Sequence, residues 1–261
     1  MWRAGIAIVL LLSSCTTTAT QPQSSANTAN APAPITPPPS SWTDVSPKIR
    51  INRVDCAVEF EAISVITTGF LESYVCTVGT REHESLFAFD GKASEIHAAM
   101  LLAGFVPGAP GRWREVAAAE GSVAAAEGSL AAAEGSFSVE SVAPSGNAVR
   151  VTIRLPDGHE FPIDHFARTA PIDATTAANP APARFVFGGS RFQTDRKSGR
   201  ERYLADGSGS LIGLVTFGDE TIGAAEVVPD QAGVATPTWE VFSERMPTPG
   251  TRVTIMVNRI P

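Results

Sequence analysis

The sequence predicts a β-dominated α+β domain with about ten short, mainly antiparallel strands and one buried helix at residues 94–104. This class follows from alternating apolar and polar runs, from Gly and Pro turns between them, and from one apolar segment with helical start and stop signals. Hydrophobic residues make up 43% of the 261 residues, enough for one sizeable core. The pattern leaves open whether the strands form one sheet or two packed sheets.

The first half of the domain is expected to hold three strands and the helix. The strands are expected at residues 49–65, 71–78 and 81–90. In the first strand Val58 and Phe60 alternate with Glu59, and the second strand returns beside it as a hairpin. The helix begins at Ser94, a favourable N-cap residue, and ends at Gly104. It is apolar on nearly every face, so we expect it to pack between the sheet and loops.

The second half is richer in strands. We expect them at residues 147–155, 159–166, 185–188, 202–205, 210–217, 223–228 and 251–258, with a Pro- and Ala-rich loop at 171–182. Before them, residues 116–136 read VAAAEGS, VAAAEGS, LAAAEGS, an insertion with a period of seven. Each unit contains a glycine, which costs about 1 kcal/mol in a helix relative to Ala. We interpret the repeat as a duplicated surface loop, with a small coiled-coil contact as the alternative.

The N-terminus carries a location signal. A short positive start is followed by an apolar stretch at residues 5–12, too short to span a bilayer. The sequence Leu12-Ser13-Ser14-Cys15 then resembles the lipobox of bacterial lipoproteins. The resemblance implies a signal peptide at 1–14, cleavage before Cys15, and palmitate-type acyl chains on Cys15 that anchor the protein stably. Thr16 after the cysteine implies the outer membrane, and an ordinary secretory signal is the alternative.

Residues 15–41 form a lipidated cysteine and a tether, and residues 42–261 form the globular domain. The stretch 16–41 has no charged residue and one large aliphatic, so it cannot bury enough surface to fold. A flexible chain of this length spans roughly 30 Å. Loss of Arg3 with the signal peptide takes the formal net charge from −7 to −8. The excess of acidic residues excludes a nucleic-acid partner. The expected partner is the membrane, which the protein would bind through its lipid anchor.

Two cysteines remain for the folded domain. The predicted hairpin would bring Cys56 opposite Cys76, and an oxidising envelope favours a disulfide between them. The alternative is two buried, reduced thiols whose Cα atoms lie too far apart to be bridged.

Several segments resemble one known family. These are GTREHESLFAFDGKASEIHAAMLLAGFVPG at 79–108, FVFGGSRF at 185–192, RYLADGSGSLIGLVTFG at 202–218 and PGTRVTIMV at 249–257. Together with Leu71-Glu72 and Cys76 they make residues 50–260 similar to YdjY-domain proteins. The resemblance implies a fold neighbourhood and no reaction. Some proteins of that name are described as ferredoxin-like, but two thiols cannot supply the four ligands of an iron–sulfur cluster, so no cofactor is expected.

His83, Glu84 and His97 form a candidate polar site. His83 and Glu84 lie on the strand expected at 81–90, and His97 lies in the first turn of the following helix. There the helix dipole keeps an imidazole neutral, the form that binds metal or acts as a base. The spacing of the two histidines matches no zinc motif, so no metal ligands and no catalytic residues are assigned. The structural alternative is that His97 hydrogen-bonds a carboxylate on the strand.

Two functions from different classes follow. The preferred one is a bacterial cell-envelope lipoprotein whose periplasmic or surface-facing domain is a non-catalytic binding or structural module for an envelope protein or glycan. The other is a metal-binding or acid–base enzyme domain that uses His83, Glu84 and His97. We prefer the first because each motif has a simpler structural explanation. For example, Gly207-Ser208-Gly209-Ser210 reads as a turn and not as a nucleophile elbow.

The lipobox predicts that Cys15→Ala abolishes incorporation of a fatty-acid analogue, because the thiol that carries the acyl chains is removed. In-gel detection of a labelled fatty acid measures this, with Cys56→Ala as a control that keeps full labelling. Equal labelling of Cys15→Ala and the unaltered chain would rule the anchor out.

Overall fold

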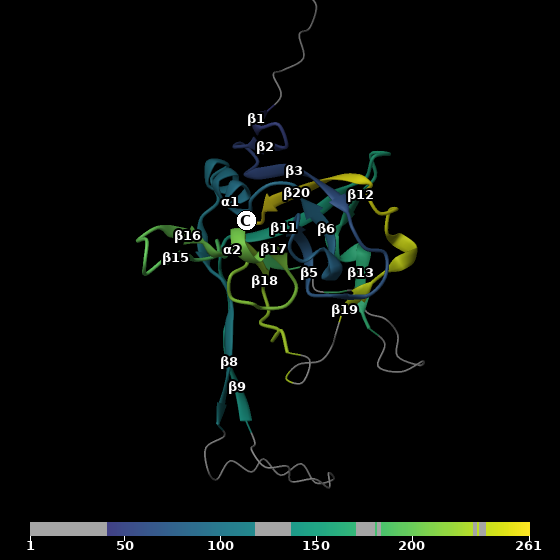
Figure 1. Cartoon of the computed structure of the whole chain (residues 1–261). Coiled ribbons are helices and arrows are strands. Elements are labelled where there is room, and N and C mark those ends of the chain that lie inside the picture. The colour runs from purple at the N-terminus through teal and green to yellow at the C-terminus, as the bar shows by residue number, and fades with distance from the viewer. Residues whose placement is uncertain (1–40, 118–136, 171–180, 182–183, 232–233, 235–238) are drawn as a thin grey trace, which may run out of the picture. The chain divides into compact units, whose positions relative to one another are not determined.

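The main sheet of the protein closes into an eight-stranded barrel (Figure 1). The computed structural model describes residues 41–117, 137–170, 181, 184–231, 234 and 239–261, within a compact unit Ser40–Pro261. In these residues twenty strands accompany two α-helices, which confirms the β-dominated α+β class. The expectation of one sheet or two packed sheets needs correction, because the last strand of the main sheet pairs back with the third strand and closes a barrel.

Eight strands follow one another around the barrel. In order they are β3 (Ala57–Ser64), β20 (Arg252–Arg259), β11 (Ala148–Arg154), β14 (Phe185–Val186), β18 (Ile222–Ala224), β17 (Ser210–Gly213), β5 (Ser73–Thr77) and β6 (Ser85–Phe89). The β17–β18 and β5–β6 pairs are parallel, and the other six are antiparallel. The last pair, β6 with β3, places Ile63 opposite Ala88 and Ser64 opposite Phe87 and so closes the barrel.

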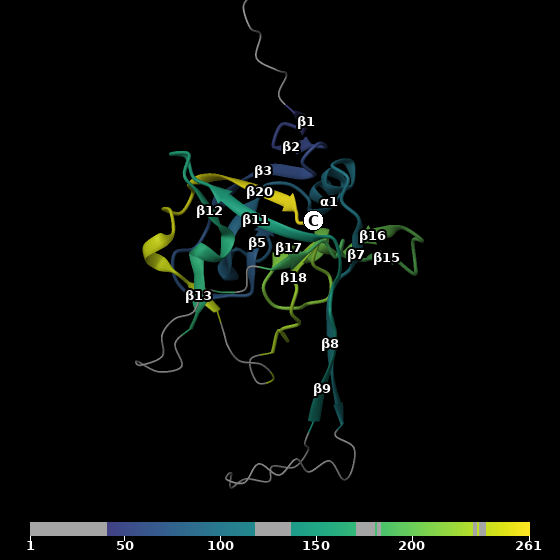
Figure 2. The same cartoon turned by 180° about the vertical axis from the view of Figure 1, so that it is seen from behind.

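Shorter strands extend and flank the barrel. β1 (Trp42–Ser46) pairs with β2 (Ile49–Asn52), which pairs with the first half of β3, and β12 (Glu160–Pro162) pairs with β11. The small sheets contain β4 (Phe70–Leu71), β13 (Ala167–Thr169) and β19 (Trp239–Val241), then β7 (Pro107–Ala109) with β10 (Ser145–Gly146), and β15 (Phe192–Thr194) with β16 (Glu201–Tyr203). The last pair, β8 (Arg112–Ala117) with β9 (Phe137–Val142), forms a ribbon that extends away from the barrel (Figure 2). Most of the heptad repeat, at 118–136, lies outside the described residues.

Helix α1 (Ala93–Leu102) confirms the predicted helix, although its start is capped differently. The N-cap residue is Lys92, and Ser94 lies inside the first turn. There the Ser94 amide and hydroxyl each donate a 2.8 Å hydrogen bond to the carboxylate of Asp206, on helix α2 (Leu204–Ser208). Gly104 ends the helix with a φ of +94°, as expected. One face of α1 is buried in the core, whereas Leu101 and Leu102 on another face are partly exposed.

Aromatic side chains fill the core. Phe60 of β3 meets Phe89 of β6 edge to face at 5.3 Å between ring centroids, across the closing pair of strands. Tyr74 of β5 meets Phe185 of β14 in the same way at 5.6 Å. Each of these rings is almost fully buried. Because edge-to-face pairs add to the hydrophobic stabilisation, strands distant in sequence are held together through the centre of the domain.

The single strand expected at 49–65 is two strands joined by a turn. The side-chain oxygen of Asn52 accepts the amide protons of Val54 (3.0 Å) and Asp55 (3.1 Å), which reverses the chain. Cys56 completes the turn with a φ of +47°. Val54 is therefore 82% exposed instead of facing the core.

The predicted hairpin between the first and second strands is wrong. β5 pairs with β6 and β17 instead of β3. Cys56 lies in the turn before β3 and Cys76 lies within β5, and both are free thiols, so the expected disulfide is not formed. Burial raises the pKa of the Cys76 thiol, which keeps it protonated and unreactive.

The strand expected at 81–90 begins later than predicted. A 3₁₀ turn, Glu82–Glu84, precedes β6, and similar turns occupy Ile163–Phe166 and Ser243–Arg245. The predicted hairpin after residue 147 is confirmed by the pairing of β11 with β12. Of the part of the chain that the structure describes, no helix has the length and apolar character to cross a bilayer.

Candidate functional site

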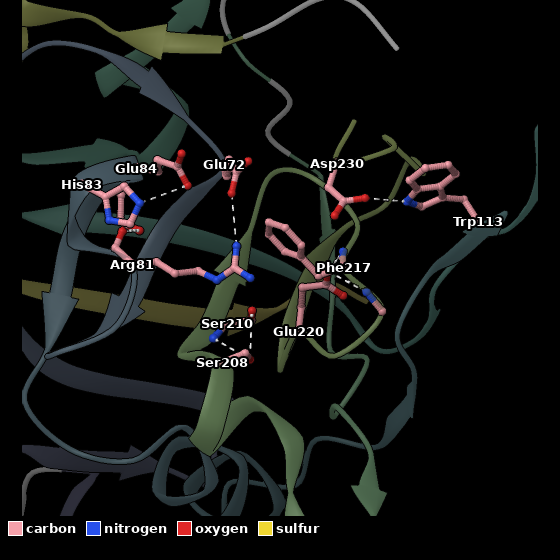
Figure 3. Close-up of polar contacts among 12 residues, drawn as sticks. Glu72, Arg81, His83, Glu84, Trp113, Ser208, Ser210, Phe217, Glu220 and Asp230 are labelled. Atoms are coloured by element: carbon pink, nitrogen blue, oxygen red, sulfur yellow. Dashed lines mark hydrogen bonds and ion pairs between the residues drawn. The ribbon is translucent and has the colours of Figure 1, made fainter. Parts of the chain in front are cut away.

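Two glutamates meet where the parallel strands β5 and β6 begin. Glu72 directly precedes β5, and Glu84 ends the 3₁₀ turn that leads into β6. Parallel neighbours start at the same edge of a sheet, so the two residues become adjacent, and the Glu72 amide donates to the Glu84 carbonyl oxygen at 3.0 Å. Figure 3 shows both side chains above this edge, with Arg81 and His83 beside them. We call Glu72, Arg81, His83 and Glu84 the Glu72–Glu84 site.

The environment of Glu72 favours its protonated form. Burial raises the pKa of Glu72 to about 7, and the hydrogen bond and negative charge of Glu84 act in the same direction. The positive charge of Arg81 has the opposite effect and lowers the pKa of Glu72, because Nη1 of Arg81 lies 3.1 Å from Oε2 of Glu72. Glu72 therefore keeps its proton up to about pH 7.

A loop after β17 supports Arg81 from the other side. The guanidinium lies 3.8 Å from the ring centroid of Phe217, a cation–π contact. Phe217 is held in turn by Glu220, whose buried carboxylate accepts the amide protons of Phe217 and Gly218, the latter at 3.1 Å. Burial raises the pKa of Glu220 to about 7 despite these bonds. A Cβ at Gly213 would lie 2.7 Å from Glu220, so only glycine leaves room for this carboxylate.

An open cleft adjoins the Glu72–Glu84 site. Trp113, at the base of the β8–β9 ribbon, donates from Nε1 to the Thr216 carbonyl and to Asp230, both at 3.1 Å (Figure 3). The negative charge of Asp230 also raises the pKa of Glu72, which shows that the two carboxyl groups are near each other. The cleft has a volume of about 530 Å³ and is lined by Trp113, Arg114, Glu115, Phe217, Asp230 and Gln231.

The structure brings His83 and Glu84 together but leaves His97 apart. His83 Nε2 lies 3.6 Å from the Glu84 carboxylate, and its side chain is largely exposed. His97 Nδ1 instead lies 2.9 Å from the hydroxyl of Tyr203, which is 3.0 Å from that of Thr221. Burial lowers the pKa of His97 and keeps it neutral. The alternative of a carboxylate partner for His97 is therefore also wrong, because its partner is a tyrosine hydroxyl.

The other predicted polar features lie elsewhere or have structural roles. His159 pairs with Asp157 at 3.1 Å, and His165 stacks on Phe161 with ring centroids 4.4 Å apart. The segment Gly207-Ser208-Gly209-Ser210 is the end of helix α2 and the start of β17, where a simple turn was expected, and Gly209 ends the helix in the left-handed conformation. Across the described ranges, no group of three or more His, Cys, Asp and Glu side chains is arranged to hold a metal ion. The predicted lipidation site, Cys15, lies outside those ranges.

A second hollow of about 470 Å³ lies beside β1 and β2. Acidic and basic side chains both line this hollow, and they form ion pairs with one another. The buried carboxylate of Glu59 lies 2.8 Å from Arg154 and 3.5 Å from Arg50. Arg154 also bonds Glu160 at 2.7 Å. Because both arginines are already paired with glutamates, this hollow has fewer free polar groups for a ligand than the Glu72–Glu84 site.

Sequence reasoning missed Glu72 and Arg81 as partners of Glu84, and it missed Phe217 and Asp230 entirely. Glu72 and Arg81 fall in or next to segments that resemble YdjY-domain proteins, which was the available signal. Their proximity depends on the parallel pairing of β5 with β6, for which the local pattern gives no cue.

The fold and site define a β-barrel domain with a carboxylate pair beside an open cleft. Residues 53–258 match the family model described as the YdjY domain, so the chain belongs to the YdjY domain family. This confirms the resemblance seen in the sequence. Searches among curated proteins and among solved structures each found no match.

The raised pKa of Glu72 predicts a pH-dependent contribution to stability. In the folded state the group binds a proton up to about pH 7, whereas in the unfolded chain it releases it near pH 4.5. Between these values the folded state holds more protons, so this contribution is present at low pH and lost as the pH rises. Urea unfolding at several pH values should show a steeper decline for the unaltered chain than for Glu72→Gln.

Glu84→Gln serves as the second variant, because it removes the negative charge that raises the pKa of Glu72 and should lower that pKa. A carbon-13 NMR titration of the Glu72 carboxyl group reports it directly. A Glu72 pKa near 4.5 in the unaltered protein would contradict the raised pKa.

Proposed function

We propose that this protein is a membrane-anchored envelope lipoprotein whose barrel domain is a binding module with its ligand at the Glu72–Glu84 site. The observation that carries the proposal is the pair of adjacent glutamates, of which Glu72 has a pKa raised to about 7, next to an open cleft. Groups with strongly shifted pKa values in or beside a cleft are enriched at functional sites, because catalysis and binding often need a group that titrates near neutral pH.

The site is held rigidly, which favours binding. Besides its amide bond to Glu84, the carbonyl oxygen of Glu72 accepts the amide protons of Leu214 (3.0 Å) and Val215 (3.1 Å). The backbone of Glu72 is thus fixed to β6 and to the end of β17 at once. A ligand that binds here does not have to order these groups, so less of its binding energy is lost.

The chemistry of the cleft fits a polar envelope component. Trp113 and Phe217 supply aromatic surface and Asp230 supplies acceptor oxygens in the cleft, while Glu84 and Arg81 supply an acceptor and a donor in the adjoining Glu72–Glu84 site. Sites of this kind combine apolar contact area with a few placed polar groups that fix orientation. Glycans and polar protein segments of the cell envelope have matching hydroxyl and amide groups, so they are the proposed ligands.

The location rests on the N-terminal sequence. Acyl chains on Cys15 would anchor the protein, and the uncharged tether of 16–41 would hold the domain within roughly 30 Å of the bilayer. Thr16 favours the outer membrane, with the domain facing the periplasm or the cell surface. No nucleic acid and no resident cofactor enter this proposal.

A second function is favoured by one observation. A carboxyl group with a pKa of about 7 can both accept and donate a proton at neutral pH. The alternative is therefore an acid–base enzyme domain in which Glu72 exchanges the proton and Glu84, His83 and Arg81 position the substrate. His97 has no part in it, because its partners are Tyr203 and Phe187.

The test is retention of isolated cell-wall glycan and solubilised envelope protein on the immobilised full-length chain. We expect Glu72→Gln/Glu84→Gln to reduce retention by at least about tenfold, which corresponds to the loss of one charged hydrogen bond. The matched control is Glu61→Gln/Glu226→Gln, which changes two exposed glutamates away from the site. Equal retention by the site variant would contradict the binding proposal. A ligand released in chemically altered form only from the unaltered chain would favour the enzyme.

A further inference from the structure

We propose that one face of the domain docks onto an anionic lipid bilayer. This docking face consists of Val54, Leu101, Leu102, Val106 and Ile260, and the inference rests on the lipoprotein anchor proposed above. Large apolar side chains at these positions are between 36% and 82% exposed. They make up five of the eleven exposed large apolar residues in the described ranges, and exposed apolar patches mark interaction surfaces.

Hydrogen bonds join the segments that carry these residues into one surface. The amide of Arg259 donates to the Cys56 carbonyl at 3.0 Å, and its guanidinium lies 3.5 Å from the Gly104 carbonyl. The amide of Ile260 donates to Ala148, and that of Val106 to the side chain of Asn147. The turn that holds Val54, the end of α1 and the C-terminus are therefore neighbours, as Figure 1 also shows.

The charge at this face suits an anionic surface. Arg53 precedes Val54 in the exposed turn, and Arg259 precedes Ile260 at the end of β20. Asp55, exposed in the same turn, accepts a hydrogen bond from the side-chain amide of Asn52 at 2.6 Å and keeps its negative charge, so these residues carry two arginines against one carboxylate. Arginine side chains near a bilayer are attracted to the headgroups of anionic lipids. Apolar side chains bordered by cations are typical of surfaces that insert shallowly into the interface.

The point where the tether joins the folded domain favours lipid as the partner of the docking face. Ser41 accepts a hydrogen bond from Asn52 Nδ2 at 2.8 Å, and Asn52 in turn holds the amide of Val54 at 3.0 Å. The tether therefore enters the domain at the turn that presents Val54. A lipid anchor on a tether of roughly 30 Å keeps the docking face at high effective concentration near the bilayer. Weak apolar contacts are then enough to hold the face on the membrane.

This orientation has a consequence for the cleft. The views in Figures 1 and 2 agree that β1, β2 and α1 lie at one end of the domain, and that the β8–β9 ribbon extends from the other. A domain docked through Val54 and Leu101 would direct the ribbon, with Trp113 at its base, away from the bilayer. The cleft would remain open to ligands in the envelope space.

The test is hydrogen exchange of the full-length, lipidated protein in vesicles of phosphatidylcholine mixed with phosphatidylglycerol. We expect amides of residues 53–56 and 101–106 to exchange several-fold more slowly than in vesicles of phosphatidylcholine alone. Val54→Asp/Leu101→Asp should abolish this protection, since both side chains are exposed and the fold does not need them. The control, Phe70→Asp/Val139→Asp, alters two exposed apolar residues elsewhere and should keep it.

The outcomes separate the docking face from the anchor. Acyl chains on Cys15, seen by intact mass, without protection at residues 53–56 would overturn the docking face alone. An unmodified Cys15 would overturn the lipoprotein proposal and the docking face with it. Protection without vesicles, together with the mass of a dimer, would also overturn the inference, because it would show that a second copy covers this face. Equal protection in both vesicle types would overturn the role of anionic lipid.

Discussion

The pairing of β6 with β3 is the constraint on which the rest of the structure depends. It consists of only two residue pairs and one further bond, from the Val65 amide to the Leu86 carbonyl at 3.0 Å. Behind it, Phe60 and Phe89 pack edge to face in the core. In a closed barrel every barrel strand has a neighbour on both sides, so none of the eight is an edge strand. Without this short contact, β6 would be a free edge strand.

Closure also determines where the polar groups meet. With β6 fixed against β3, β5 is held between β6 and β17 and runs parallel to β6. Parallel alignment puts the residues before both strands at one edge, where Glu84 lies beside Glu72 and helps to raise its pKa. The antiparallel partner β17 leads into the loop of Phe217, whose ring supports Arg81. The site is thus a consequence of strand order, not of any one segment.

Local features were predictable, and long-range pairing was not. The alternation of residues in β11, the helix that ends at Gly104 and the turn before β12 all follow from local pattern and were predicted. The turn at 53–56 was missed, because Val54 and Cys56 continue the apolar alternation, while the side chain of Asn52 stabilises the reversal. The predicted hairpin paired β5 with β3 in antiparallel orientation. It therefore placed Cys56 opposite Cys76 and led to the incorrect prediction of a disulfide between them. Within the site, His83 and Glu84 were identified from their residue types, whereas Glu72 required knowledge of the parallel pair.

The central claim, a barrel closed by β3 and β6, is tested most directly by hydrogen exchange at the seam. The account predicts that the amide of Val65, which donates to the Leu86 carbonyl across the seam, exchanges as slowly as that of Ile255, which lies in the middle of β20 between two neighbours. Exchange at Val65 as fast as at Thr43, in the edge strand β1, would show an open sheet and would contradict the closed barrel.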